Sequence, residues 1–210
     1  MRKTATRGLV LWAAVMLAVG LLAAGAGPWA IHLSWQNDPA TTMTIMWRTT
    51  PEIQESVVEY GLTPEYGQQA IGTRFSYTAL RQEIVWHMVE LTELTPNTTY
   101  HYRCGAPGYW SADYTFTTAP LSNDPRATFS FAVYGDTRGG YAISGQILQA
   151  LKEKSVRFIL FTGDFTNGAG QYEYDMWYKA AGDVLASLPF MPVHGNHCLL
   201  YTSPSPRDRT

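Results

Sequence analysis

The sequence has little cysteine and little charge. Two of its 210 residues are cysteines, Cys104 and Cys198, which excludes a framework of several disulfides. Charged residues make up 15% of the chain, with 15 Lys and Arg against 17 Asp and Glu. Setting aside five basic residues and one acid near the two ends leaves ten basic and 16 acidic side chains between residues 28 and 197, a net charge of −6. No nucleic-acid partner bound through a basic face is therefore expected.

One long apolar run is present, at the N-terminus. Arg2, Lys3 and Arg7 precede an uncharged stretch over residues 8–27, in which Ala24 and Ala26 form a small-residue cleavage site. This layout predicts a secretory signal peptide over residues 1–26. An uncleaved anchor is the alternative, because about 19 apolar residues approach the length of a membrane span. Either way the rest of the chain is expected to be secreted, periplasmic or on the cell surface, with no stable membrane span unless the signal is uncleaved.

The last residues have a different character. Residues 198–210, CLLYTSPSPRDRT, resemble in their first eleven positions the translation of an adapter used to prepare sequencing libraries. We therefore expect 198–210 to be a non-native tail and the natural sequence to continue beyond His197. A native loop rich in Ser and Pro is the alternative.

The first half of the chain is dominated by short alternating runs. Their period of two, their β-branched and aromatic residues and the turn residues between them predict an antiparallel β-sandwich over residues 28–120. The runs are residues 31–35, 43–47, 57–60, 84–91, 99–103 and 114–117. The stretch from Leu94 to Tyr100 resembles the tyrosine corner of a fibronectin type III domain, in which a Tyr bonds back to the preceding loop.

No residue of this half is expected to carry catalysis. His32, His87 and His101 lie in alternating strands and share no metal-ligand spacing, so we interpret them as structural rather than as metal ligands. The sequence Asn97-Thr98-Thr99 matches a glycosylation acceptor and equally suits a turn. The first half is expected to support or shield the second half of the chain.

The second half, residues 126–197, changes period after a linker near 119–126. Apolar strands are predicted at 128–134, 158–162 and 190–193. The stripe of Ile143, Ile147, Leu148 and Leu151 predicts a helix after the first strand. A second stripe, which predicts another helix, consists of Tyr174, Trp177, Tyr178, Ala181, Leu185 and Leu188. Strands that alternate with helices predict a parallel sheet in an α/β domain.

Each predicted strand of this half ends in the same kind of motif. The motifs are Gly135-Asp136, Gly163-Asp164 and Gly195-Asn196, and His197 follows the last. Because parallel strands point the same way, these side chains are expected at one edge of the sheet, where such folds bind ligands. Two carboxylates, a carboxamide and an imidazole suit hard or borderline divalent cations. A single Gly-Asp is usually an ordinary turn, but three in register predict a metal site.

These three motifs resemble the first three motifs of the calcineurin-like metallophosphoesterases. The stretch from Trp110 to Pro120, WSADYTFTTAP, resembles the N-terminal domain of purple acid phosphatases. The resemblance implies a phosphoric ester hydrolase acting on small phosphate esters, with two metal ions (Fe, Zn or Mn) and metal-bound hydroxide as the nucleophile. It further implies that Asp136 binds the first metal, Asp164 bridges both, Asn196 binds the second and His197 contacts the phosphoryl group.

The sequence departs from these families at two positions. Purple acid phosphatases carry a metal-binding Tyr where this chain has Asn167, and many other superfamily members carry a ligand His where it has Arg138. The iron–tyrosinate colour is therefore not expected. Arg138 is a candidate phosphate contact or a surface residue of a Gly turn, and Asn167 is a candidate substrate contact or a loop cap.

The family completes its metal site with later histidines, so a chain that ends here is expected to bind metal weakly and hydrolyse little. Two alternatives to a phosphatase stay open. One is a phosphodiesterase or nucleotidase with the same machinery, and the other is a cell-surface binding module with a decayed phosphoesterase half.

Overall fold

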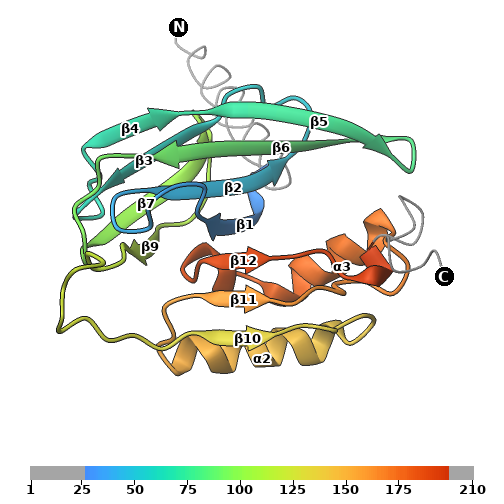
Figure 1. The fold of residues 1–210 in the computed structure, drawn as a ribbon. Coiled ribbons are helices and arrows are strands. Elements are labelled where there is room, and N and C mark those ends of the chain that lie inside the picture. The colour runs from blue at the N-terminus through green and yellow to red at the C-terminus, as the bar shows by residue number, and fades with distance from the viewer. Residues whose placement is uncertain (1–26, 199–210) are drawn as a thin grey trace, which may run out of the picture.

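The computed structural model of the chain describes residues 27–198. The predicted signal peptide at 1–26 and residues 199–210 of the predicted tail lie outside this range. Two antiparallel sheets form the first half (Figure 1). One sheet has the order β1 (Trp29–Ser34), β2 (Met43–Thr49), β6 (Gln82–Leu91) and β5 (Thr73–Ala79). The other has the order β4 (Gln68–Ile71), β3 (Val57–Gly61), β7 (Thr99–Ala106) and β8 (Tyr109–Trp110), with β9 (Tyr114–Thr117) also paired to β7.

The alternation that predicts these strands places one face of each sheet in a shared core. Leu33, Ile45 and Trp47 from the first sheet pack with Val58 and Tyr102 from the second, and none of these side chains is exposed. Burial of such side chains is worth about 1.5–3 kcal/mol each. The predicted sandwich is therefore confirmed.

The tyrosine corner is also present. The hydroxyl of Tyr100, at the start of β7, accepts the backbone N–H of Thr95 at 3.0 Å. Three strands escaped the prediction. Strands β4 and β5 carry mostly exposed side chains and lack a continuous apolar face, and β8 is only two residues long. Strand β4 lies at an edge of one sheet and β5 at an edge of the other.

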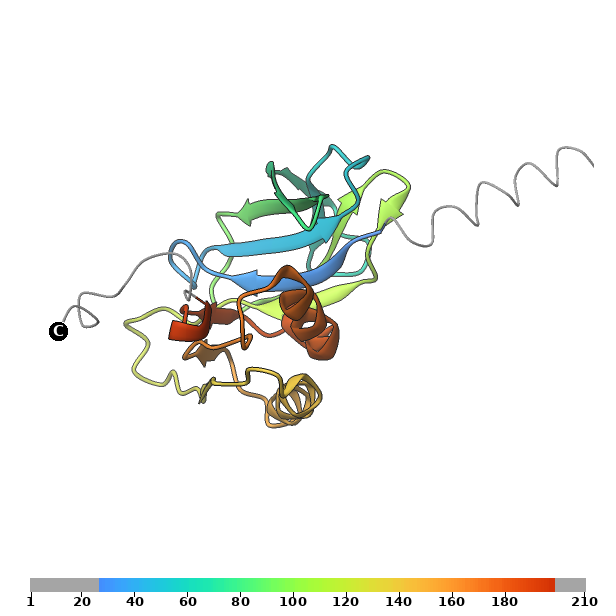
Figure 2. The same ribbon diagram turned by 90° about the vertical axis from the view of Figure 1, so that its right-hand side faces the viewer.

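The second half is a three-stranded parallel sheet with helices on one side (Figure 2). Its elements are β10 (Ala132–Tyr134), α2 (Tyr141–Glu153), β11 (Ile159–Phe161), α3 (Gln171–Ala181), the 3-10 helix η2 (Val184–Ala186), β12 (Phe190–Pro192) and the 3-10 helix η3 (Asn196–Cys198). Ile159, Phe161 and Phe190 point toward Leu148 and Trp177 of the helices. The predicted β-sandwich followed by an α/β domain is confirmed.

Several predicted boundaries shift. Strand β10 begins at Ala132 rather than at residue 128, and the side chains of Phe129 and Phe131 are about half exposed. On α2, Ile143 is 64% exposed, whereas Leu148 is fully buried. The apolar stripe is thus wrong in part, because that helix turns Leu148 rather than Ile143 toward the sheet.

The second predicted helix is shorter than its stripe. Helix α3 ends at Ala181, because Gly182 follows with a positive φ of 57°. Such a left-handed residue commonly ends a helix. Leu185 continues the apolar pattern from within η2, where it is again buried.

The two halves share side chains across their contact. Ala186 of η2 lies in the sandwich core, and its carbonyl accepts the hydroxyl of Tyr102 at 2.7 Å. Arg48 of β2 is 5% exposed and forms a salt bridge with Asp175 of α3. The sandwich therefore fixes η2 and α3, the segments between β11 and β12. Within residues 27–198, helix length and apolarity nowhere reach what a membrane crossing needs.

Candidate metal centre

The ends of the three parallel strands are aligned. Tyr134, Phe161 and Pro192 are register partners, so the residues after them leave the sheet at one edge. The first two turns are joined there, because the backbone N–H of Asp136 donates to the carbonyl of Gly163 at 2.8 Å. The predicted convergence of the motifs at this edge follows from the register.

Glycine is required where the turns approach each other. Gly163 has a φ of 97°, and a Cβ on it would lie 2.5 Å from the backbone nitrogen of Gly195. A Cβ on Gly195 would lie 1.9 Å from Oδ1 of Asp164. These distances leave no room for a side chain, so both glycines let the second and third turns touch.

Both aspartates have strained backbones. Asp136 and Asp164 each have a φ of 56°, in the left-handed region. This conformation costs L-residues about 1–2 kcal/mol, although Asp tolerates it better than most. Strain of this kind clusters at functional sites, and here it occurs at the same position of two successive motifs.

A guanidinium lies between the two carboxylates. Nε of Arg138 donates to Oδ1 of Asp136 at 2.6 Å, and its Nη2 lies 3.8 Å from Oδ2 of Asp164. The side chain of Asp164 is 10% exposed, whereas that of Asp136 is 68% exposed. Arg138 therefore pairs with one solvated and one buried carboxylate, and its positive charge offsets their repulsion.

His197 is held by two hydrogen bonds. Its backbone N–H donates to Oδ1 of Asp164 at 2.9 Å, and its ring Nδ1 lies 2.9 Å from the carbonyl oxygen of Asn167. A carbonyl oxygen only accepts, so Nδ1 carries the proton in this contact. The other ring nitrogen, Nε2, is then free of a proton when the imidazole is neutral.

The structure brings most of the predicted site residues into one cluster. Asp136, Arg138, Asp164, Asn167 and His197 are joined by the contacts above, through the backbone in the case of Asn167. Asn196 precedes His197 at the start of η3, and its side chain is exposed. Their predicted roles in binding metal and phosphate stay predictions.

Two supporting residues were missed in the sequence, Thr137 and Glu173. The hydroxyl of Thr137 lies 3.4 Å from the Asp164 carbonyl and accepts the indole N–H of Trp177 at 3.2 Å. The carboxylate of Glu173 accepts the backbone N–H of Gly170, the N-cap of α3, at 3.3 Å. A Glu three residues after an N-cap is a known helix-start signal, so Glu173 was recognisable in principle. Thr137 left no such signal.

The donor types suit a cation, but the set is incomplete. Asp136, Asp164 and Asn196 offer oxygen ligands, which hard divalent cations prefer. Across residues 27–198 there is no cluster of three or more His, Cys, Asp or Glu side chains that could hold a metal ion. The described residues therefore fit as part of a metal shell and do not complete one.

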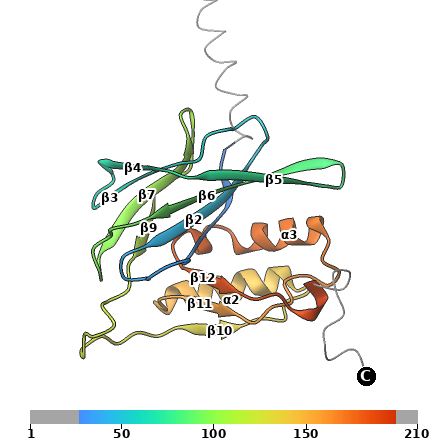
Figure 3. The same cartoon turned by 45° about the horizontal axis from the view of Figure 1, so that its top comes forward.

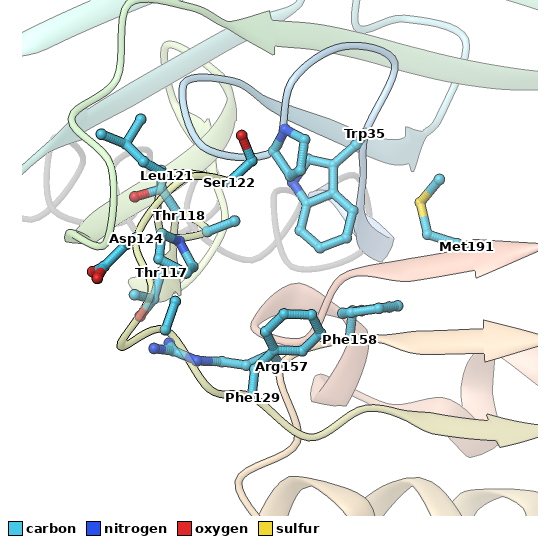
Figure 4. A pocket seen from close by; sticks show the side chains of 14 residues that line it. Trp35, Thr117, Thr118, Leu121, Ser122, Asp124, Phe129, Arg157, Phe158 and Met191 are labelled. Carbon is cyan, nitrogen blue, oxygen red and sulfur yellow. The ribbon is translucent and has the colours of Figure 1, made fainter.

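A separate apolar cavity lies at the junction of the two halves (Figure 4). It has a volume of about 500 Å³ and is lined by Trp35, Phe129, Phe158 and Met191 among others. Phe129 and Phe158 precede β10 and β11, so this cavity adjoins the opposite end of the sheet from Asp136 and Asp164. It contains none of the predicted site residues.

Two family models match the chain. Residues 28–118 match the model described as purple acid phosphatase, N-terminal domain, and residues 129–209 match calcineurin-like phosphoesterase. The second match extends past His197 into the segment predicted to be a non-native tail. The first match ends at residue 118 and the second begins at residue 129, so the predicted linker lies between them.

Curated relatives are similar over most of the chain. Acid phosphatase type 7 of Mus musculus is 32% identical over 182 residues, which are 81% of this chain and 40% of the mouse protein. Purple acid phosphatase 22 of Arabidopsis thaliana is 29% identical over 81% of this chain and 38% of its own length. The chain thus spans about two fifths of the length of these relatives.

A solved structure shares the fold. The purple acid phosphatase PPD1 from yellow lupin (Lupinus luteus) seeds matches with a TM-score of 0.68 at 19% identity. The match covers 82% of this chain and 36% of the lupin chain. It extends over both halves, so the arrangement of sandwich and parallel sheet is that of a known fold.

Proposed function

The chain belongs to the purple acid phosphatases within the calcineurin-like phosphoesterases, and on that premise we propose that it acts in metal-dependent hydrolysis of phosphate esters. The observation that carries the proposal is the cluster of Asp136, Arg138, Asp164 and His197 at one edge of the sheet. Oxygen ligands, a guanidinium and an imidazole at one place are the groups that a phosphate ester and its metal ions require.

In this proposal the metal ligands are Asp136, Asp164 and Asn196, with Asp164 shared between two ions. The ions, drawn from Fe, Zn or Mn, would supply a nucleophile and neutralise charge on the phosphoryl oxygens. The burial of Asp164 supports its central role, because a carboxylate removed from water interacts more strongly with a cation. The exposed carboxylate of Asp136 sits at the outer side of the site.

Arg138 and Asn167 are the proposed substrate contacts. The guanidinium of Arg138 is hydrogen-bonded to Asp136 and forms a longer ion pair with Asp164 in the present structure. A cation bound by those carboxylates competes for the same oxygens, which frees the guanidinium to pair with phosphate. Asn167 has an exposed side chain in the loop after Asp164, so its amide is accessible to a substrate.

His197 is proposed to contact the phosphoryl group or the leaving group. Its Nδ1 is occupied by the Asn167 carbonyl, so Nε2 is the nitrogen left for the substrate. In the protonated ring Nε2 donates a hydrogen bond to a phosphate oxygen or a proton to the leaving oxygen. Its backbone bond to Asp164 fixes the residue beside the metal ligands.

We further propose that the protein is exported by its N-terminal segment and acts on small phosphate esters outside the cytoplasm. The 210-residue chain itself is expected to bind metal weakly and to turn over slowly, because its described ligands are too few for two ions. Without a Tyr at position 167, the visible colour of an iron–tyrosinate is not expected.

The test is hydrolysis of para-nitrophenyl phosphate by the whole chain, with added Mn²⁺ or Zn²⁺. We expect a slow rate that needs metal, vanishes with a chelator and is lost in Asp164→Asn. Asp124→Asn, in the linker, is the matched control and should keep the rate. A metal-independent rate, or one unchanged in Asp164→Asn, would overturn the assignment. A rapid rate would instead contradict the expected weakness of the chain.

A second candidate is a cell-surface binding module whose phosphoesterase half has lost catalysis. The observation in its favour is that Arg138 already neutralises both carboxylates. It predicts neither metal binding nor hydrolysis in the assay above. A phosphodiesterase or nucleotidase would be distinguished by faster hydrolysis of bis(para-nitrophenyl) phosphate than of the monoester.

A further inference from the structure

Glu173 lies outside the predicted site but is bonded to the loop that leads into it. Its carboxylate accepts the backbone N–H groups of Asn167 at 3.1 Å, Gly168 at 3.0 Å and Gly170 at 3.3 Å. The hydroxyl of Tyr141, in α2, donates to the same carboxylate at 3.1 Å. Three loop amides and one hydroxyl therefore converge on a single side chain.

These bonds determine the shape of the loop between Asp164 and α3. An arrangement of converging backbone N–H groups binds anions, and here the anion is an internal carboxylate. Burial alone would raise the pKa of Glu173, but the bonds from Asn167, Gly170, Tyr141 and Gly168 lower it overall. The carboxylate thus stays charged, and the loop is tied to the first turn of α3.

The same loop holds His197. The carbonyl of Asn167 accepts the Nδ1 proton of His197 at 2.9 Å, while the N–H of Asn167 is bonded to Glu173. The backbone N–H and the carbonyl of Asn167 lie on either side of its Cα. A bond that fixes the N–H therefore also restricts the position of the carbonyl. Displacement of this loop would withdraw the carbonyl that accepts the ring proton.

The sandwich contacts the start of α3 through two neighbours of Glu173, Gln171 and Asp175. The hydroxyl of Tyr77, in β5, donates to Gln171 at 2.7 Å, and Arg48 pairs with Asp175. Gln171 and Asp175 flank Glu173 on the first turns of α3. Figure 3 shows the hairpin of β5 and β6 extending past α3, consistent with this contact. The helix start that carries Glu173 is therefore fixed from both halves of the molecule.

We propose that Glu173 is a positioning residue for His197, which it keeps in the Nδ1-protonated form by holding the Asn167 carbonyl in place. The inference rests on the proposed function for its purpose, since Nε2 is the nitrogen offered to the phosphate ester. Its geometry does not depend on any metal. Glu173 touches no substrate and acts through the loop.

The test is ¹⁵N NMR of the histidine rings in the metal-free, substrate-free chain, at a pH where the imidazoles are neutral. In the native chain we expect His197 to be mainly the Nδ1–H form, opposite to the preference of free imidazole. In Glu173→Ala the major form should change to Nε2–H. Glu173→Gln, which keeps one acceptor oxygen without the charge, should lie between the two.

Two control variants separate positioning from general disruption. Tyr141→Phe removes the bond to Glu173 that does not come from the loop, and Glu153→Gln changes an exposed acid of α2. Both should leave the His197 form unchanged. Folding is checked in the same samples through the indole N–H signal of Trp177. If Glu173→Ala is unfolded, Glu173→Gln alone decides.

A folded Glu173→Ala or Glu173→Gln chain with native-like Nδ1–H content at His197 would overturn the proposal. So would a native chain in which His197 is mainly Nε2–H. The measurement uses no phosphate ester and no metal, so a failure of the hydrolysis assay leaves it intact. Conversely, loss of the tautomer effect would not weaken the assignment of Asp164.

Discussion

Arg138 is the residue whose substitution separates metal binding from turnover. Its guanidinium bonds to Asp136 and lies near Asp164, so it competes with a cation for both carboxylates. We expect Arg138→Ala to bind Mn²⁺ about tenfold more tightly, which corresponds to about 1.4 kcal/mol, and to hydrolyse para-nitrophenyl phosphate more slowly. Calorimetric titration and the hydrolysis assay measure the two effects. Arg157→Ala, at the far end of the sheet, should change neither, and weaker Mn²⁺ binding in Arg138→Ala would contradict the competition.

His87 is predicted from the sequence to be structural, and the structure gives it a consequence for stability. It is fully buried, stacks on Trp47 and is hydrogen-bonded to Ser56 and Thr49. Desolvation, aided by the charge of Arg74, lowers the pKa of His87 from 6.5 to about 4. The folded state therefore binds this proton more weakly than the unfolded state does, and stability falls as the pH drops from about 6.5 toward 4.

His87→Gln removes the titrating imidazole and with it this pH dependence of stability. The native chain should have the higher free energy of unfolding at pH 7, and its difference from His87→Gln should narrow by about 2–3 kcal/mol at pH 4.5. Urea unfolding at the two pH values measures the difference. His101→Gln, whose ring pairs with Asp113 at a partly exposed position, serves as the control. A pH-independent difference between native and His87→Gln would show that His87 does not titrate as described.

Among elements, the β5–β6 hairpin is the one that the sequence least specifies. Ala79 and Gln82 are register partners, so Leu80 and Arg81 form a two-residue turn, and their φ values are 50° and 63°. A turn with two positive φ values favours Asn-Gly. We expect the double substitution Leu80→Asn and Arg81→Gly to raise the free energy of unfolding by about 1–2 kcal/mol, measured in urea.

The control for this hairpin is Leu62→Asn. Leu62 is 64% exposed, close to the 74% of Leu80, but its φ is not positive. Its substitution should change the stability little. An unchanged or lower stability in the hairpin variant, with Leu62→Asn neutral, would mean that the turn is not strained.

The same hairpin shows what the pattern of residues leaves out. Alternating apolar residues predicted the buried strands of the sandwich. Repeated Gly-Asp motifs predicted the edge at which the parallel strands of the second half end. The first signal comes from burial and the second from close approach of the backbone. Strand β5 carries exposed side chains and a turn without Gly, so neither signal marks it. On α2, apolar spacing alone did not reveal that Ile143 faces solvent, because that depends on where the sheet lies.

At the scale of the whole molecule, Tyr102 joins the two halves. It is fully buried in the sandwich, and its hydroxyl donates to the carbonyl of Ala186 in η2. Tyr102→Phe leaves that buried carbonyl without its donor, at a cost of about 1–3 kcal/mol. We expect faster amide hydrogen exchange in η2 and α3, measured by mass spectrometry.

Tyr100→Phe is the matched control, because the Tyr100 hydroxyl bonds to Thr95 within the sandwich. It should speed exchange in the loop around Thr95 and spare α3. Equal effects of the two variants on α3 would argue against a specific bond between the halves.

The sequence predicted the linker between the halves, but their contact depends on residues far apart along the chain, such as Arg48 and Asp175, and no local pattern marked it.

We propose that the aligned strand ends form a metal site built around Asp164. The most direct measurement is calorimetric titration of Mn²⁺ into the native chain and into Asp164→Asn, with Asp124→Asn as the control. We expect weak, saturable binding of Mn²⁺ to the native and control chains and at least about tenfold weaker binding to Asp164→Asn. Equal binding by all three chains, or none by the native chain, would contradict it.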